Sequence, residues 1–340
     1  SLLPSPPVQA PSGARAAALP PVFLPLRGSR GPPPMAVAVI GVGHLGSRHA
    51  KIYSELGDKV NLAGVCDINP EKAQTIGQQY RCPFFTNYTQ LFGKISAASI
   101  CVPTVLHYAI AREFLQRGTH LLVEKPITKN LKEADALIRL AAKKKLTLQV
   151  GHVERFNSAF QAIRTLARNP HFVECHRLNL FPNRSLDIGV VLDLMIHDID
   201  IVLGLEDSAI KDTQAVGVKV LTDYEDIANA RITFKDGCVC NLTASRISDE
   251  VMRKIRIFTK DAYISLDYCK QEAFIYKKHP GGGISKQALP IEKEEPLRKE
   301  LESFVDCVSL RQKPLVAGIE GRAALSLALK IQEKIWANKK

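Results

Sequence analysis

The sequence has no apolar run near the roughly 20 residues that a membrane-spanning helix needs, although 46% of its 340 residues are hydrophobic. It also has no internal repeats. These absences exclude a protein built on membrane-spanning helices and a repeat array, and they leave an ordinary globular chain. Since one hydrophobic core rarely grows beyond roughly 250–300 residues, this length predicts two domains.

No C-x-x-C motif occurs among the eight cysteines, and no set of Cys and His residues has the spacing of a zinc site. Cys66 and Cys101 fall in apolar segments, and Cys238 and Cys240 alternate along another. We therefore expect no metal and no disulfide framework. Reduced, mostly buried thiols are typical of a protein in the cytoplasm.

Nucleic-acid-binding motifs are missing as well, although the net charge is +12 at pH 7. The basic residues are scattered among acidic ones, and a run such as Lys143–Lys145 is typical of a solvated helix face. We expect no nucleic-acid partner. An anionic substrate explains the positive charge as well as a polymer does.

Acidic residues are absent from residues 1–34, which hold ten of the twenty prolines and three arginines. Such a segment cannot bury enough apolar surface to fold, so we expect a disordered leader. Its prolines argue against the amphipathic helix of a transit peptide. Met35, directly before the first predicted strand, is a candidate for the natural translation start.

The remainder of the chain, from Met35 onward, has two kinds of sequence pattern. Residues 35–152 alternate between apolar strand patterns and helical patterns, which predicts a parallel sheet with right-handed crossovers, an α/β Rossmann domain. Residues 153–295 contain two helical patterns and then a succession of strands with short turns, which predicts an α+β domain with an open, mainly antiparallel sheet. Residues 296–340 are expected to form two helices that pack back near the first domain.

The segment VAVIGVGHLG, residues 37–46, ends an apolar run in the G-x-G-x-x-G spacing. Gly41 permits the tight turn, Gly43 lets a pyrophosphate approach the backbone, and Gly46 lets the next helix pack closely on the sheet. Asp67 ends the second apolar run, where an acidic side chain accepts hydrogen bonds from the adenosine ribose hydroxyls. Because its carboxylate would repel a 2′-phosphate, we expect NAD rather than NADP.

A reacting group is expected at Glu124–Lys125–Pro126, directly after an apolar strand pattern. The proline restricts Lys125 to extended geometry and ends the strand. Lys125 would then point into the cofactor cleft, where its ammonium can polarise a carbonyl or alkoxide oxygen during hydride transfer. A surface lysine at a turn is the alternative.

A second reacting group is expected in the predicted helix that contains Asp193 and His197. These residues are four apart and would share a helix face. A carboxylate beside an imidazole holds one tautomer and raises its proton affinity, which suits a general base for alcohol oxidation. A structural capping pair and a metal site are the alternatives, although few zinc ligands are available.

Substrate contacts are expected where the two domains meet, in the segment GHVERFN that ends at Asn157. Arg155, together with Arg184 in a later loop, can hold phosphate or carboxylate groups. Either arginine can instead form a structural salt bridge.

Seven segments together resemble the Gfo/Idh/MocA oxidoreductase family over residues 36–338. They are GVGHLG, CDINPEKA, CVPTVLHYAIA, LLVEKPIT, GHVERFN, GVVLDLMIHDID and the closing VSLRQKPLVAGIEGRAALSLALKIQE. The resemblance implies a Rossmann domain, a C-terminal α/β domain with an open sheet, and association through that sheet as a homodimer or homotetramer.

The resemblance also implies roles for individual residues. Lys125 would contact nicotinamide and substrate, His197 would be the acid/base with Asp193 beside it, and the Lys125–Pro126 bond would be cis. The implied cofactor contacts are Gly41, Gly43, His44, Leu45, Gly46, Asp67, Pro103, Thr104, His107, Glu124 and Lys125. The implied substrate contacts are Lys125, Arg155, Asn157, Arg184, Asp193 and His197.

Within the family, GHVERFN and DLMIHDID are most similar to members that act on UDP-activated amino sugars. This implies NAD-dependent oxidation of the C3 hydroxyl of UDP-N-acetylglucosamine, in a lipid A precursor pathway with a partner transaminase. A dehydrogenase of a free polyol or hexose, such as inositol, is one alternative. A non-catalytic dinucleotide-binding sensor is another, which the presence of Lys125, Asp193 and His197 disfavours.

Overall fold

A computed structural model describes residues 33–181, 188–279 and 281–337. Nearly all of the expected leader, and Arg184, lie outside these ranges.

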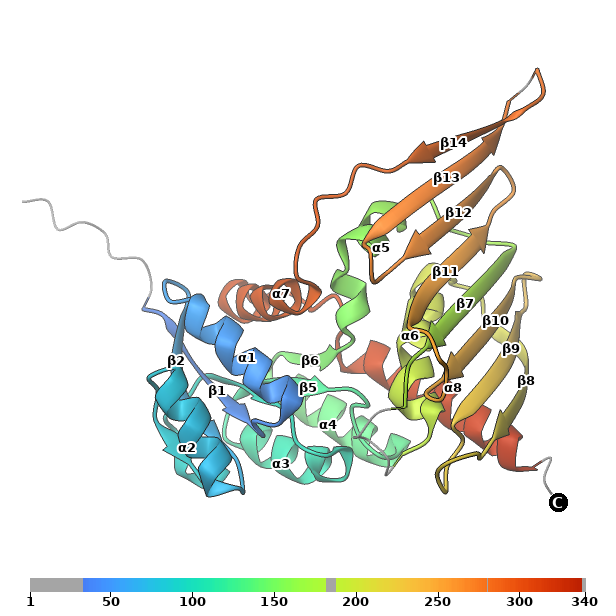
Figure 1. The fold of residues 1–340 in the computed structure, drawn as a ribbon. Coiled ribbons are helices and arrows are strands. Elements are labelled where there is room, and N and C mark those ends of the chain that lie inside the picture. Colours follow the sequence, from blue (N-terminus) through green and yellow to red (C-terminus); the bar gives the residue numbers. More distant parts are fainter. Residues whose placement is uncertain (1–32, 182–187, 280, 338–340) are drawn as a thin grey trace, which may run out of the picture. The chain divides into compact units, whose positions relative to one another are not determined.

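Six parallel strands form the first sheet, in the order β3-β2-β1-β4-β5-β6 (Figure 1). The chain winds outward from β1 in one direction and from β4 in the other, so a topological switch point lies between these two strands, where open α/β sheets bind ligands. The predicted Rossmann fold is confirmed. The strands are β1 (Met35–Ile40), β2 (Val60–Cys66), β3 (Phe84–Phe85), β4 (Ala97–Ile100), β5 (His120–Glu124) and β6 (Leu148–Gly151), and the connecting helices are α1 (His44–Glu55), α2 (Pro70–Gln79), η1 (Tyr88–Leu91), α3 (Thr104–Gln116) and α4 (Leu131–Lys144).

Local sequence signals fix where two of these helices begin. The side chain of Asn69 accepts a hydrogen bond from the backbone N–H of Lys72, and Pro70 occupies the first position of α2. Asn130 caps α4 in the same way, by accepting from the N–H of Glu133. Asparagine is a favoured N-cap because its oxygen binds an N–H group that has no partner within the helix.

Eight strands form the second sheet, in the order β14-β13-β12-β11-β7-β10-β9-β8. All neighbouring strands are antiparallel except β7 and β10. The predicted mainly antiparallel sheet is therefore confirmed, with one parallel pair at its centre. The strands are β7 (Phe172–Leu178), β8 (Ile210–Val218), β9 (Ile227–Phe234), β10 (Val239–Ser245), β11 (Met252–Phe258), β12 (Ala262–Asp267), β13 (Glu272–Lys278) and β14 (Ile284–Ala288).

The two faces of the second sheet differ. On one face pack α5 (Ser158–Ile163), the π-helix η3 (Val191–Met195), α6 (Ile196–Leu205) and α8 (Gly318–Ala337) (Figure 1). On the other face four aromatic rings form a row across neighbouring strands, with ring centroids 5.7, 4.7 and 4.9 Å apart. These rings belong to Phe172, Phe258, Tyr263 and Tyr276.

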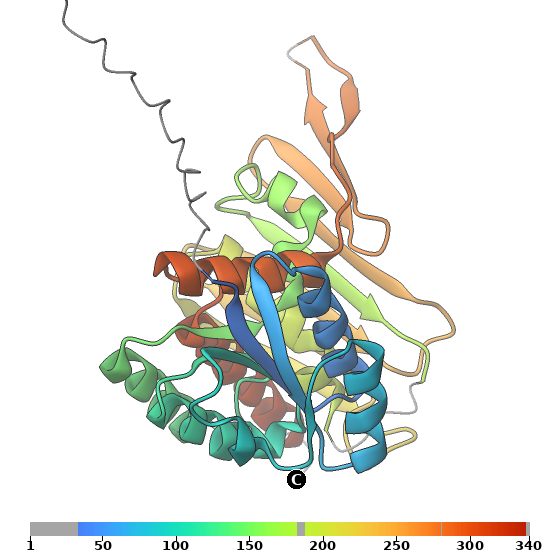
Figure 2. The same cartoon turned by 90° about the vertical axis from the view of Figure 1, so that its left-hand side faces the viewer.

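The last two helices join the two sheets. The first, α7 (Pro296–Leu310), packs against α1 and against the short helix η2 (Val153–Phe156), as Figure 2 shows for α1. The second, α8, contacts α4 and β6 as well as α6 and β8. Within the described ranges no helix combines the length and apolarity that crossing a bilayer requires.

Candidate active site

The glycine motif forms the turn between β1 and α1. Gly41 has a φ of +86°, and a Cβ there would lie 2.7 Å from the carbonyl oxygen of Cys101. A Cβ on Gly46 would overlap the carbonyl oxygen of Gly41, so α1 can pack on this turn only because residue 46 is glycine. Among the described atoms, none lies within 4 Å of a Cβ built on Gly43. The start of α1 is thus open to a phosphate group.

Asp67, which follows β2, is hydrogen-bonded to the same turn. Its Oδ2 accepts from the backbone N–H of Val42 at 2.9 Å, and its Oδ1 accepts from the N–H of Asn69 at 2.9 Å. The carboxylate therefore lies where the motif predicts the adenosine ribose. The next residue, Ile68, is 92% exposed and leaves an apolar surface directly after this carboxylate. Ile68 is not among the expected cofactor contacts, although an apolar residue directly after the acidic one was the available signal.

A cavity of about 910 Å³ lies at the carboxyl ends of β4, β5 and β6 and reaches the second sheet. This volume is in the range of ligand-binding sites. The residues that line it come from both halves of the chain. They include the expected residues His44, Leu45, Pro103, Thr104, Glu124, Lys125, Asn157, Asp193 and His197.

Lys125 is held by Asp193. Its Nζ donates to the backbone oxygen of Asp193 at 2.6 Å and to the Oδ1 of the same residue at 3.2 Å. The Lys125–Pro126 peptide bond is cis, as the family resemblance implies. The ammonium thus sits at the end of β5, in the cavity wall, with its position fixed from the second half of the chain.

His197 is not paired with Asp193, which differs from the expectation. Asp193 lies in the π-helix Val191–Met195, and α6 begins only at Ile196. The wider turn changes which residues share a face, so four-residue spacing does not bring the two side chains together. The carboxylate pairs with Lys125, and the Nδ1 of His197 is buried with no hydrogen-bond partner.

The surroundings of His197 favour the neutral imidazole. Burial lowers the pKa of His197 well below its usual range, and the positive charges of Lys125, Arg177 and Arg253 act in the same direction. The ring of His152 lies edge-on to that of His197, with centroids 6.2 Å apart. The expected increase in proton affinity is therefore wrong, but a neutral imidazole is still the form that can accept a proton.

Arg155 has the structural role that the sequence left open. It is buried, its Nε donates to Asp200 Oδ2 at 2.7 Å and its Nη2 to Asp200 Oδ1 at 3.3 Å. Asn157 lines the cavity, but its amide donates to the carbonyl oxygen of Tyr268 at 3.2 Å and its Oδ1 accepts from the N–H of Ala159 at 3.1 Å. Neither side chain is available to a substrate as it stands.

His107 connects two loops of the first sheet. Its Nδ1 lies 2.9 Å from the carbonyl oxygen of Pro126, and its Nε2 lies 2.8 Å from that of Val102. Burial lowers the pKa of His107, while both carbonyl contacts oppose that shift. His107 therefore holds the segment after Lys125 against the loop after β4, and it does not line the cavity.

Four arginines that were not expected line the cavity: Arg48, Arg177, Arg246 and Arg253. Arg177 on β7 is buried and pairs with Asp198 at 2.8 Å and with Glu154 at 2.9 Å. Arg253 on β11 also lines the cavity, and within the described part of the chain its buried Nε has no hydrogen-bond partner. The signal for Arg177 was its place two residues after Cys175, on the inward face of a strand with period two.

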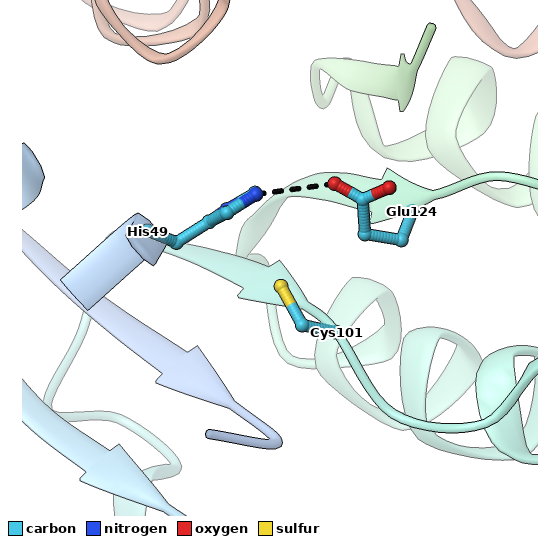
Figure 3. Close-up of side chains that lie close together, drawn as sticks. All are labelled: His49, Cys101 and Glu124. Atoms are coloured by element: carbon cyan, nitrogen blue, oxygen red, sulfur yellow. Dashed lines mark ion pairs between the residues drawn. The ribbon is translucent and has the colours of Figure 1, made fainter. Parts of the chain in front are cut away.

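A buried group of three potential metal ligands lies beside the cavity (Figure 3). His49 Nε2 is 3.1 Å from Glu124 Oε1, and the Sγ of Cys101 is within 4.8 Å of both side chains' ligand atoms. Burial, and then the negative charges of Glu124 and Glu300, raises the pKa of Cys101 well above its usual value. The contact between His49 and Glu124 joins α1 to β5.

Two family models match the chain. The model of the Gfo/Idh/MocA oxidoreductase family, with an NAD-binding Rossmann fold, matches residues 35–152. The model of the GFO/IDH/MocA C-terminal domain matches residues 149–265.

Individual proteins match over nearly the whole chain. UDP-N-acetylglucosamine 3-dehydrogenase of Acidithiobacillus ferrooxidans is 38% identical over 309 residues, which are 89% of this chain and 98% of that protein. A solved structure of that enzyme has a TM-score of 0.85 to this chain, covering 90% of this chain and 99% of its own. Inositol 2-dehydrogenase of Rhizobium meliloti is 25% identical over 315 residues, 85% of this chain and 93% of that protein.

Proposed function

Since this chain belongs to the Gfo/Idh/MocA family of NAD(P)-dependent oxidoreductases acting on CH–OH groups, we propose that it oxidises the C3 hydroxyl of UDP-N-acetylglucosamine to a ketone. The observation that supports this substrate is the 38% identity to UDP-N-acetylglucosamine 3-dehydrogenase over nearly all of both chains. The ketone would then be aminated by a partner transaminase, in a lipid A precursor pathway.

The cavity residues supply the chemistry of this oxidation. When bound, NAD⁺ would supply the hydride acceptor. The ammonium of Lys125, oriented by Asp193, can donate to the substrate oxygen as negative charge develops on it. The imidazole of His197, kept neutral by burial and by neighbouring cations, can accept the hydroxyl proton.

Arg253 is the cavity cation best suited to a substrate diphosphate. Of the other arginines that line the cavity, Arg48, Arg177 and Arg246 are each paired with carboxylates. Among the residues that the structure describes, the Nε of Arg253 is buried without a hydrogen-bond partner. A guanidinium binds phosphate oxygens through two parallel N–H donors. This contact distinguishes a nucleotide sugar from a free sugar.

The substrate proposal is tested by NADH production with UDP-N-acetylglucosamine, UDP-glucose, UDP-N-acetylglucosaminuronic acid, glucose and myo-inositol. A transaminase with glutamate is included because it consumes the ketone and so shifts an unfavourable equilibrium towards oxidation. We expect turnover with UDP-N-acetylglucosamine alone. Arg253→Glu should raise its KM by about tenfold or more and leave NAD affinity unchanged.

Other outcomes of the same assay point elsewhere. Turnover on a free polyol only would replace the nucleotide sugar by a substrate such as inositol, in line with the Rhizobium meliloti relative. Binding of NAD without turnover on any compound would favour the alternative of a non-catalytic dinucleotide-binding sensor.

The preference for NAD over NADP depends on Asp67. Asp67→Ala removes the charge that repels a 2′-phosphate and the acceptor for the Val42 N–H. We expect NAD affinity to fall by about 10–100-fold, as for a lost hydrogen bond to a charged group, and the preference over NADP to shrink. Fluorescence titration with both nucleotides measures this. Unchanged NAD affinity in Asp67→Ala would contradict the assignment.

Two further properties belong to the same proposal. The aromatic row on the open face of the second sheet (Phe172, Phe258, Tyr263 and Tyr276) supports association through that sheet as a homodimer or homotetramer. All eight cysteines are free thiols, which supports a reducing compartment such as the cytoplasm.

A further inference from the structure

His152, directly after β6, is a buried histidine whose ring has no hydrogen-bond partner. It is 1% exposed, and within the described part of the chain neither its Nδ1 nor its Nε2 forms a hydrogen bond. Its backbone is fixed on both sides, because its N–H donates to the carbonyl oxygen of Val150 at 2.8 Å and its carbonyl oxygen accepts from the N–H of Arg155 at 3.0 Å. Buried polar groups nearly always have a partner, so this imidazole calls for an explanation.

The ring of His152 lies beside that of the expected base, His197. The two rings are edge-on, with centroids 6.2 Å apart and planes at 81°. The Nδ1 of His197 is also buried and unpaired among the described residues, whereas its Nε2 is exposed to the cavity that His197 lines. A substrate can therefore reach Nε2 only. One histidine in the cavity wall and one buried outside it thus place their unpaired nitrogens next to each other.

The chemistry of a base determines where the proton of a neutral His197 must be. A neutral imidazole carries one proton, on Nδ1 or on Nε2, and accepts only through the other nitrogen. To take a proton from a substrate hydroxyl through Nε2, His197 must carry its own proton on Nδ1. The hydrogen bond of that second nitrogen usually fixes the tautomer. A carboxylate often accepts it, but here Asp193 is paired with Lys125.

We propose that His152 is the positioning residue of His197: a ring nitrogen of His152 accepts a hydrogen bond from the Nδ1–H of His197 and so keeps Nε2 unprotonated. The proposal rests on the role of His197 in the proposed function and is independent of the sugar. In the oxidation the O–H bond of the substrate breaks, the oxygen keeps the electron pair, and the proton binds Nε2. The proton on Nδ1 stays in place.

The surroundings of both rings favour this direction of the hydrogen bond. Burial lowers the pKa of His152, so its ring is neutral and has a lone pair to offer. Lys125 lines the cavity, and its positive charge favours a lone pair over an N–H group on the cavity side of His197. The two rings are not hydrogen-bonded in this structure. Such catalytic hydrogen bonds are often long without substrate and shorten in the complex.

NMR of the full chain with nitrogen-15-labelled histidine measures the tautomer directly, because protonated and unprotonated ring nitrogens differ in chemical shift. The signals of His197 are identified by their loss in His197→Ala. At pH 7.5, with and without NAD⁺, we expect the proton on Nδ1. His152→Phe keeps an aromatic ring but has no acceptor. In this variant we expect the proton on Nε2, where it can be donated to water in the cavity.

Kinetics test whether His152 acts through His197. His152→Phe should lower kcat by about 10–100-fold, part of the 10²–10⁴ that general-base catalysis supplies. KM and NAD affinity should change little, because His152 does not line the cavity. His152→Asn or His152→Gln, whose amide oxygens lie near the positions of Nδ1 and Nε2, should recover part of the loss. The matched control is His152→Phe in the His197→Ala background, where kcat should fall no further.

A proton on Nε2 of His197 in the unaltered chain, or an unchanged tautomer in His152→Phe, would overturn this proposal alone. Equal losses of kcat from His152→Phe with and without His197 would overturn it too, because they would show a merely structural role. Absence of turnover on any compound would overturn the proposed function, and NMR would still decide whether His152 holds the tautomer. The spectrum of the unaltered chain also decides if His152→Phe does not fold.

Discussion

Replacement of His197 by alanine is expected to lower kcat for alcohol oxidation by about 10²–10⁴, with little change in NAD affinity. His197 lines the cavity together with Lys125, and its Nδ1 has no hydrogen-bond partner among the residues that the structure describes. The neighbouring His152 is buried and does not line the cavity, and His44, which does line it, lies at the first position of α1. Steady-state kinetics and a separate NAD titration measure the two quantities.

The pH profile of the unaltered enzyme tests the same role. Because burial and the charge of Lys125 hold the pKa of His197 well below 6.5, the imidazole stays unprotonated as the pH falls through the ordinary histidine range. We therefore expect kcat/KM for oxidation to be level across neutral pH and to fall only well below pH 6.5. His120→Ala is the control, since burial also lowers the pKa of His120 but it lies outside this cavity. Full turnover of His197→Ala at neutral pH would refute the assignment.

The first sheet could be predicted in detail because its signals are local. The glycine spacing, the acid at residue 67 and the proline after Lys125 each act within a few residues of the strand ends that they mark. For the second sheet, the sequence predicted a mainly antiparallel sheet but not the order of its strands. The parallel pairing of β7 with β10 joins residues more than sixty positions apart, and alternation along a strand gives its faces but not its neighbours.

The candidate site was predicted in its residues but not in their pairing. A helix of 3.6 residues per turn would place Asp193 beside His197. In the structure Asp193 lies in a π-helix, and its carboxylate pairs with Lys125 instead. Asp198 and Asp200, two acids in an otherwise apolar helix, were a signal that buried cations must face them. Those cations are Arg177 and Arg155.

The sequence also contains a weaker signal that the side chain of Glu300 is buried. In α7 the buried positions 297, 301 and 304 define the inner face, and residue 300 falls on it. A carboxylate on an apolar helix face is uncommon unless it is paired or protonated.

Lys125→Met is expected to lower kcat by about 10²–10³, the usual loss when one donor to a developing oxyanion is removed. Methionine keeps most of the length of the side chain but has no N–H to donate and no charge. NAD affinity should change little, because the phosphate and ribose contacts lie at the glycine turn and Asp67. Measurement of kcat, KM and NAD affinity separates the two effects.

A charge effect on His197 makes this prediction more specific than a loss of activity. Lys125 is the cation that lowers the pKa of His197 most, after burial itself, so its removal should move the acid limb of the residual activity to higher pH. Lys125→Met also leaves the carboxylate of Asp193 without its counter-ion. The double variant Lys125→Met/Asp193→Asn removes that second charge and should restore stability but not turnover. The assignment would be contradicted if Lys125→Met turned over within about threefold of the unaltered enzyme, because that loss is less than 1 kcal/mol of transition-state stabilisation. The ammonium would then only hold η3 against β5.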